Sequence, residues 1–256
     1  LRELNFNLWK YCMFRREKSL VLTDLPDKIR QVNTCEITNR KEYMDAERDL
    51  IMYLQKYKDA DDDKIAKAMR GEVMVRINIL RQISARGKVR DVIEFVKDFR
   101  ENGKKIILFC SLHEVVDQLK RYFPTAVSVT GRDSQDEKQR AVDAFQNNPK
   151  ADIIICSIKA AGVGLTLTAS SNVAFVEFPW TYADCCQCED RAHRIGQKDS
   201  VTCYYFLGRR TIDEKVYRII QEKKNIANAV TGSTEDIEEN IVDMVARIFD
   251  TDYDDE

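Results

Sequence analysis

Residues 104–119 read KKIILFCSLHEVVDQL, and this stretch decides the fold class. Its centre, IILFC at 106–110, is short, apolar and rich in branched side chains, which predicts a strand buried on both faces of a parallel sheet. Ser111 and Glu114 follow with the spacing of a capping box, so we expect a helix to begin there. A buried strand followed directly by a helix is the repeating unit of an α/β fold.

The same alternation of strand and helix continues around this stretch. Apolar residues at helical intervals over 89–99 predict a helix that the Asn-Gly pair at 102–103 ends. Capping-box spacings that begin at Ser134 and Thr211 predict two more helix starts. Further buried strands are predicted at AVSV (126–129), IIIC (153–156), VAFVEF (173–178) and VTCYYF (201–206). The sequence therefore predicts a mainly parallel sheet covered by helices on both faces, with ligands at the carboxyl ends of the strands.

The two ends of the chain have a different composition. Residues 41–85 combine many charged side chains with apolar residues at helical intervals, which predicts a helical linker or protrusion. IRQVNTCEIT, which follows Pro26, alternates like a strand. From Thr234 onward ten acidic residues accompany one arginine, which predicts a flexible tail. Without that tail the chain has 40 basic and 33 acidic residues, and a charge of about +7 is compatible with a nucleic-acid-binding face.

The bulk composition limits the classes of protein. The chain has 256 residues, 44% of them hydrophobic, which is enough for one large or two small domains. No apolar run approaches the roughly 20 residues of a membrane helix, and no signal peptide is visible, so we expect an intracellular protein in the cytoplasm, with the nucleoid, or in the nucleus. Because the chain opens with Leu1 rather than Met, we expect it to be a piece of a longer protein.

The cysteines do not predict a metal site. There are eight, without the paired CxxC spacing of a zinc site. Cys185, Cys186 and Cys188 lie close to His193 in the sequence, but ligands crowded on one helix lack the second arm that tetrahedral zinc usually needs. We interpret these cysteines as small apolar residues in a reducing compartment.

The most specific string in the chain is QCEDRAHRIGQ at 187–197. On a helix, Arg191 and Arg194 would project from one face. Two guanidinium groups aimed at one point suit an anion such as a triphosphate. The alternative is a solvated helix whose arginines pair with Glu189 or Asp190. The whole string resembles motif VI of the SWI/SNF-related branch of superfamily 2 helicases and translocases.

Other stretches carry the same resemblance. CSIKAAGVGLTLTAS at 156–170 resembles motif V, 104–119 resembles motif IV, and VTGRDSQDEKQRAVDAFQ at 129–146 resembles the motif that follows it. FRREKSLVLTDLPDK at 14–28 is similar to the family's link between lobes. Glu177, in place of the more usual aspartate, points to the annealing-helicase branch.

The resemblance implies a RecA-like C-terminal lobe. The family's motor has two such lobes with ATP between them, and this chain has neither the GxxxxGK[ST] phosphate loop nor the DExH pair of the first lobe. We therefore expect residues 1–40 to hold the end of the first lobe and the crossover, 41–85 a helical linker or protrusion, 86–232 the C-terminal lobe, and 233–256 the acidic tail.

The resemblance also implies roles for individual residues. Arg191 and Arg194 would be arginine fingers of a double-stranded DNA translocase, reaching toward ATP whose phosphates and Mg²⁺ are held mainly by the N-terminal lobe. The remaining site residues fall into two groups. Gly162, Gly164, Gln187 and Gln197 would bind nucleotide, and the two glutamines could instead order the arginines. Ser111, Gly131, Arg132, Ser157 and Lys159 would meet DNA phosphates, although Ser111 could equally be a helix cap alone.

Two other functions remain open. An RNA helicase lobe would usually read HRIGRxxR, whereas Gln197 follows Gly196 here, which favours the DNA translocase. A non-enzymatic α/β module that binds nucleic acid or protein would keep the fold and the basic surface without a partner lobe. A Rossmann domain is disfavoured because no GxGxxG follows the first strand.

Overall fold

The structure is a computed structural model that describes residues 6–7, 10–11, 21–22, 24–58, 63–160 and 164–227. As far as its residues are described, the chain forms two compact units. The sheet unit comprises the described residues of Glu17–Thr38 and Ala85–Arg209, and the helical unit comprises those of Leu1–Arg16, Asn39–Ser84 and Arg210–Glu256. The predicted tail at 233–256 lies outside the described residues, and the predicted domain limits stay a prediction.

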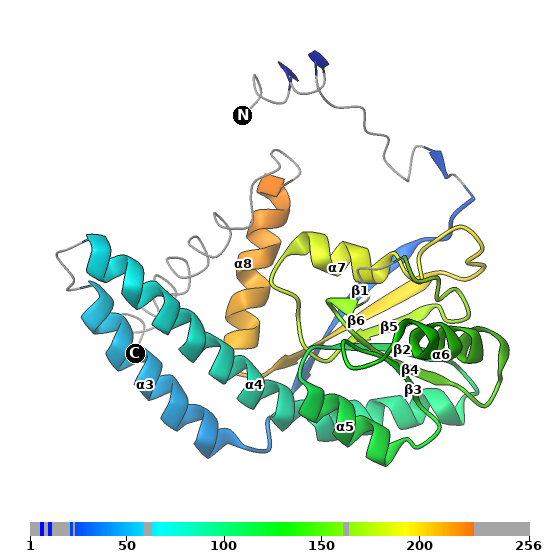
Figure 1. Ribbon diagram of the computed structural model, residues 1–256, viewed down its shortest axis with the longest axis horizontal. Helices are drawn as coiled ribbons and strands as arrows, with labels where there is room; N and C mark the ends of the chain where they lie inside the picture. Colours follow the sequence, from blue (N-terminus) through cyan, green and yellow to red (C-terminus); the bar gives the residue numbers. More distant parts are fainter. Residues whose placement is uncertain are drawn as a thin grey trace. The chain divides into compact units, whose positions relative to one another are not determined.

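The sheet unit contains six parallel strands in the order β1-β6-β5-β2-β4-β3 (Figure 1). The strands are β1 (Lys28–Cys35), β2 (Ile106–Cys110), β3 (Val127–Val129), β4 (Ile153–Ser157), β5 (Asn172–Phe175) and β6 (Val201–Gly208). All five strands predicted from residue 106 onward are present, and their ends differ from the predicted ends by three residues at most. The prediction of a mainly parallel α/β sheet is confirmed.

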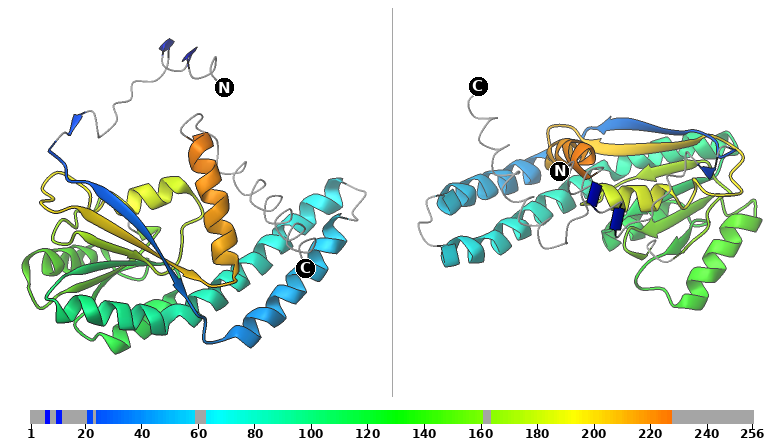
Figure 2. Two further views of the ribbon diagram at one scale, coloured as in Figure 1. Left: turned by 180° about the vertical axis from the view of Figure 1, so that it is seen from behind. Right: turned by 90° about the horizontal axis from the view of Figure 1, so that it is seen from above.

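The strand predicted after Pro26 forms the edge of this sheet. It is β1, which pairs along its whole length with β6, from Lys28 beside Val201 to Cys35 beside Gly208. Figure 2 shows β1 in blue at the edge of the sheet. Residues 28–35, which sequence analysis assigned to the crossover segment, are therefore strand residues of the sheet unit.

Helices pack on both faces of the sheet. The second half of α4 (Asp63–Glu101) and α5 (His113–Tyr122) share one hydrophobic core with alternate residues of the strands, among them Leu108 and Ile155. The intervening residues point to the other face, where Phe109 and Phe175 stack with ring centroids 5.2 Å apart. Buried residues of α6 (Gln135–Asn147) and α7 (Tyr182–Glu189), such as Phe145 and Cys188, complete the second core. The predicted two-faced covering is confirmed.

The helix starts agree only in part with their predicted caps. Ser134 and Glu137 form the predicted capping box at the start of α6. The box predicted at Ser111 is wrong, because α5 has Leu112 as its N-cap residue and no side-chain cap. The Thr211 hydroxyl accepts from the amide of Asp213 at 3.2 Å, so it caps the start of α8 (Ile212–Ala227).

The helical unit is built from α3 (Arg40–Lys58), the first half of α4, and α8. Helices occupy most of the predicted helical region at 41–85, and buried leucine, valine and isoleucine side chains line their inner faces. The Tyr43 hydroxyl is buried and accepts from the Ile212 amide at 2.6 Å. No helix in the described part of the chain is long and apolar enough to cross a membrane.

Candidate functional site

The predicted DNA-contacting residues gather at the carboxyl edge of the sheet. Ser111 follows β2, Gly131 and Arg132 lie just past β3, and Ser157 ends β4 with Lys159 two residues on. The six strands are parallel, so the ends of these strands share one edge. The structure therefore brings together five residues that are up to 48 positions apart, from Ser111 to Lys159.

These five residues differ in how accessible they are. Lys159 and Gly131 are exposed, as is Arg132, whose guanidinium forms an ion pair at 3.1 Å with the exposed Asp117. The Ser157 side chain is buried, and its hydroxyl accepts from the Ala160 amide at 3.2 Å. An exposed ion pair contributes little to stability, so the Arg132 side chain can exchange Asp117 for a phosphate at small cost. Ser157 instead shapes the turn that presents Lys159.

The main chain at Ser111 already has an anionic partner. The Glu177 Oε1 atom accepts from the amides of Ser111 at 2.8 Å and of Leu112 at 2.7 Å. Both amides precede α5, where an anion is stabilised by the helix dipole. Glu177 therefore replaces the missing side-chain cap, and sequence reasoning noticed the residue only as a departure from the family's aspartate.

The arginines of the motif VI string do not lie on one helix. α7 ends at Glu189, Asp190 is its C-cap residue, and residues 190–196 form a series of turns. Gly196 has φ of +100°, a conformation that favours glycine, and the chain reverses there. The helical spacing predicted for Arg191 and Arg194 is therefore wrong. Their separation along the turns leaves Arg194 exposed and Arg191 half-buried.

This finger turn, residues 190–197, lies at the amino edge of the sheet. The Arg191 carbonyl accepts from the Leu167 amide at 2.9 Å, and the Ala192 carbonyl accepts from the Gln197 side chain at 3.2 Å. The Gln197 amide nitrogen also donates to the Ser170 carbonyl at 3.0 Å, just before β5. Burial raises the pKa values of the Cys156 and Cys188 thiols, and the positive charge of the Arg191 guanidinium offsets part of that rise. The finger turn is thus held by hydrogen bonds within its own main chain and by hydrogen bonds to residues 167–170, which precede β5.

Gln197 and Gln187 have different surroundings. Gln197 is buried, and its Oε1 atom accepts from the amides of Lys198 and Asp199 at 2.9 and 3.2 Å. Gln187 is exposed on α7. With both ends of its amide occupied by main-chain partners, Gln197 is suited to ordering the turn, one of the two roles that the sequence left open for it.

A buried charge cluster lies beside the finger turn. Glu189 is fully buried, and its two oxygens accept from the Arg30 guanidinium at 2.8 and 2.7 Å. Lys28 reaches Glu189 at 2.9 Å and Asp190 at 3.4 Å. The Tyr205 hydroxyl donates to Glu189 as well. Sequence analysis considered Glu189 and Asp190 as partners for the finger arginines, whereas the structure pairs both with cations of β1.

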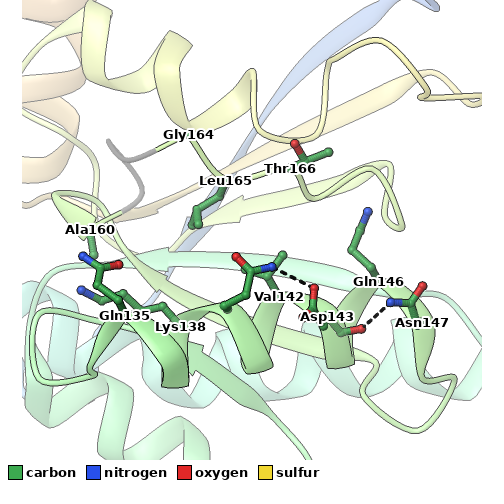
Figure 3. A pocket seen from close by; sticks show the side chains of 11 residues that line it. Gln135, Lys138, Val142, Asp143, Gln146, Asn147, Ala160, Gly164, Leu165 and Thr166 are labelled. Carbon is green, nitrogen blue, oxygen red and sulfur yellow. Dashed lines mark hydrogen bonds between the residues drawn. The ribbon is translucent and has the colours of Figure 1, made fainter.

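Gly164, one of the two predicted nucleotide-binding glycines, borders a pocket of about 550 Å³ (Figure 3). Figure 3 shows α6 on one side of it, with Lys138 and Gln146, and the segment Gly164–Thr166 on the other. Gly164 has φ of +36°, which favours glycine, and it is exposed. Gly162 lies outside the described residues. In the part of the chain that the structure describes, no group of three or more His, Cys, Asp or Glu side chains could hold a metal ion.

Comparisons with known proteins agree with the motif positions. Residues 87–196 match the family model described as "helicase conserved C-terminal domain". The chain is 30% identical over 230 residues to the SWI/SNF-related matrix-associated actin-dependent regulator of chromatin subfamily A-like protein 1 of Xenopus tropicalis, covering 87% of this chain and 23% of that protein. The chain contains a C-terminal helicase lobe of the SWI/SNF-related superfamily 2 type.

Other similarities support this SWI/SNF-related lobe. The chain is 31% identical over 232 residues to the DNA annealing helicase and endonuclease ZRANB3 of Homo sapiens, covering 87% of this chain and 20% of that protein. The Sulfolobus solfataricus SWI2/SNF2 ATPase core in complex with double-stranded DNA shares the fold, with a TM-score of 0.64 and 22% identity over 88% of this chain and 50% of that chain. The chain thus spans 23% of the length of the Xenopus tropicalis relative and 20% of the length of the human relative.

Proposed function

We propose that this lobe is the second half of an ATP-dependent translocase on double-stranded DNA, and that it supplies arginine fingers and part of the DNA track. The observation that carries the proposal is the finger turn, where Arg191 and Arg194 lie on a turn that Gln197 and Glu189 hold at one edge of the sheet. The names of the relatives, a DNA annealing helicase and an ATPase core with double-stranded DNA, support this class of substrate.

The chemistry of the finger turn fits a triphosphate. A guanidinium stays charged at any physiological pH and offers a rigid fork of donors to phosphate oxygens. Arg194 is exposed on its turn and can meet a ligand held by another lobe. ATP bound between the lobes supplies the phosphoanhydride bond whose hydrolysis drives movement. The arginines stabilise negative charge that develops on the phosphates, so they matter most when the lobes close. Mg²⁺ would be held by the first lobe, with the phosphates.

The carboxyl edge fits the DNA backbone. Gly131 and Arg132 follow β3, Lys159 follows the neighbouring strand β4, and all three residues are exposed. Contacts of this kind to phosphates carry no base information, so binding should be nearly independent of sequence and should weaken steeply with salt. A protein that acts on DNA in this way would work in the nucleus or with the nucleoid.

One segment joins the two edges. β4 ends at Ser157 on the carboxyl edge, and β5 begins at Asn172, so the residues between them must travel from the carboxyl edge back to the amino edge. The far part of this segment donates from Leu167 to the Arg191 carbonyl and accepts from Gln197 at Ser170.

The test uses the protein that contains this lobe together with the lobe that precedes it. Arg191→Ala or Arg194→Ala should lower DNA-stimulated ATP turnover by roughly 10³-fold or more and leave DNA affinity nearly unchanged. Arg132→Ala is the matched control at the other edge, and it should lower DNA affinity and the slope of its salt dependence instead. Loss of DNA affinity with ATPase retained in the finger variants would reverse these roles.

A second measurement uses the 256-residue chain alone. It should hydrolyse essentially no ATP, because the phosphate loop and the acidic pair are absent from its sequence. Robust magnesium-dependent turnover by the purified chain would overturn the two-lobe assignment. Stimulation of the two-lobe protein by RNA but not by duplex DNA would favour the RNA helicase alternative.

A further inference from the structure

The charge cluster around Glu189 connects the end of α7 to β1. We propose that Glu189, with Arg30 and Lys28 of β1, is a positioning lock that fixes the finger turn in the geometry needed for catalysis. None of the three is proposed to touch nucleotide. This inference rests on the proposed function, because it assigns residues that act through Arg191 and Arg194.

The first step of the argument is the geometry at the carboxylate. The Arg30 Nε and Nη2 atoms donate to different oxygens of Glu189, at 2.8 and 2.7 Å, in the two-pronged arrangement that fixes both position and orientation. Lys28 Nζ adds a contact at 2.9 Å, and the Tyr205 hydroxyl donates to the oxygen that Arg30 Nε also meets. These four donor contacts on a fully buried carboxylate restrain the position of the last residue of α7.

The second step is the connection from Glu189 to the arginines. The Glu189 carbonyl accepts from the Ala192 amide at 3.1 Å and from the His193 amide at 2.9 Å, the two residues that separate the finger arginines. The same residue therefore fixes the turn through its main chain while its side chain is fixed by β1. A shift of Glu189 would therefore disturb the Ala192 and His193 amides, which lie between Arg191 and Arg194.

A second contact ties the same turn to the start of β1. The His193 ring lies with Nε2 2.7 Å from the Pro26 carbonyl oxygen, and Lys28 reaches Asp190 at 3.4 Å. Residues 26–30 thus contact the finger turn at its first residue, at its middle and at Glu189 just before it. Two attachments to the turn and one to the residue before it restrain the rotation of the turn as well as its position.

The charge state of the cluster suits a permanent lock. Burial acts to raise the pKa of Glu189, but the hydrogen bonds from Arg30 and the charge of Lys28 outweigh it, so the pKa is lowered. Burial likewise acts to lower the pKa of Arg30, and Glu189 more than compensates for it. The pair is therefore ionised throughout the neutral range. A buried ion pair is often no more stabilising than apolar residues of the same size, and its advantage here is a directional hold on the turn.

The experiment compares variants of the two-lobe protein. Glu189→Gln keeps the shape of the side chain and removes the charge that orients Arg30. Since a displacement of about 1 Å can cost about 10²-fold in rate, kcat for DNA-stimulated ATP hydrolysis should fall by about ten- to a hundredfold, with KM for ATP and DNA affinity within about twofold of the unaltered protein. Affinity for ADP with aluminium fluoride should fall in parallel, while affinity for ADP alone should not change.

Two further variants separate positioning from stability. Arg100→Gln removes another ion pair of the sheet unit, with Asp152 at 2.6 Å, far along the chain from the finger turn, and it should lower the melting temperature without lowering kcat. Arg30→Lys keeps the charge but loses the two-pronged contact, and it should give an intermediate kcat even if Glu189→Gln fails to fold. All assays are made well below each variant's melting temperature.

The outcomes distinguish this inference from the proposed function. Unaltered kcat in folded Glu189→Gln and Arg30→Lys, alongside loss of ATPase in Arg191→Ala, would overturn the lock alone. An equal loss of kcat in Arg100→Gln would assign the effect to stability and would also overturn it. Retention of ATPase in Arg191→Ala and Arg194→Ala would overturn the proposed function, whatever Glu189→Gln does.

Discussion

Replacing Gln197 with alanine should lower the stability of the sheet unit, because this side chain forms hydrogen bonds with buried main-chain groups of the finger turn and of the segment before β5. Its amide nitrogen donates to the carbonyls of Ser170 at 3.0 Å and Ala192 at 3.2 Å, and its oxygen accepts from the amides of Lys198 and Asp199. The two carbonyl contacts are buried, whereas Lys198 and Asp199 are exposed and can turn to water.

The expected magnitude follows from these four contacts. The buried Ser170 carbonyl loses its donor, which costs about 1–2 kcal/mol, whereas the Ala192 carbonyl keeps the Arg194 amide as a donor at 3.0 Å and the two exposed amides cost little once hydrated. Gln197→Ala should therefore lower the free energy of unfolding by about 1–2 kcal/mol. For a chain of this size that corresponds to roughly 2–8 °C in melting temperature. Gln187→Ala, in the same string but exposed on α7, should change the free energy of unfolding by less than about 0.5 kcal/mol.

Urea and thermal unfolding of the purified chain measure both variants. Equal stability of Gln197→Ala and Gln187→Ala would refute the reasoning, because it would mean that the buried contacts of Gln197 do not hold the turn. A stable Gln197→Ala that loses only nucleotide affinity in the two-lobe protein would instead assign Gln197 to ligand binding, the alternative role that its place in the motif allows.

Three more predictions concern charged and thiol groups of the sheet unit. Glu177→Ala should lower the free energy of unfolding in urea by about 1.5–3 kcal/mol, since it removes a charge-assisted cap, while Ser111→Ala should leave it within about 0.5 kcal/mol. Cys110 should resist alkylation at pH 8 in the native chain and react in urea, since burial raises its pKa, and Cys186, half-buried, should be labelled earlier, as peptide mass spectrometry can show. The folded pKa of Glu189 is lowered, so its stabilising contribution is present above the unfolded carboxyl pKa of about 4.3 and is lost as pH falls through the folded value; acid titration of unfolding should show a shallower loss in Glu189→Gln.

The strands were predictable because a strand buried on both faces has an almost entirely apolar sequence. IILFC at 106–110 is the whole of β2, and IIIC lacks only the last residue of β4. The strand after Pro26 was also visible from its alternation, although its exposed residues include the apolar Ile29 and Val32. Its place beside β6 was not visible, because pairing between residues about 170 positions apart leaves no local signal.

The helix starts show where local patterns fail. Ser134 and Ser111 are both followed by glutamate three residues later, yet only Ser134 forms the capping box. At Ser111 a residue distant in sequence, Glu177, takes the free amides instead. A capping pattern predicts which donors need a partner, and tertiary structure decides which acceptor they meet.

The motif VI string resembles a known family, but the spacing of its residues did not predict its local structure correctly. Two arginines three residues apart predict one helical face, and that holds only if the helix continues. Here α7 ends at Glu189, because the chain must turn to enter β6 at Val201, and Gly196 permits the reversal. The acidic residues of the string form ion pairs, with Lys28 and Arg30 of β1, and ligand contact by its arginines stays a prediction. The turn of the string carries Arg194 outward. A ligand-facing turn that is anchored by a buried ion cluster can be both precise and exposed, which an isolated helix face with two mobile arginines could not be.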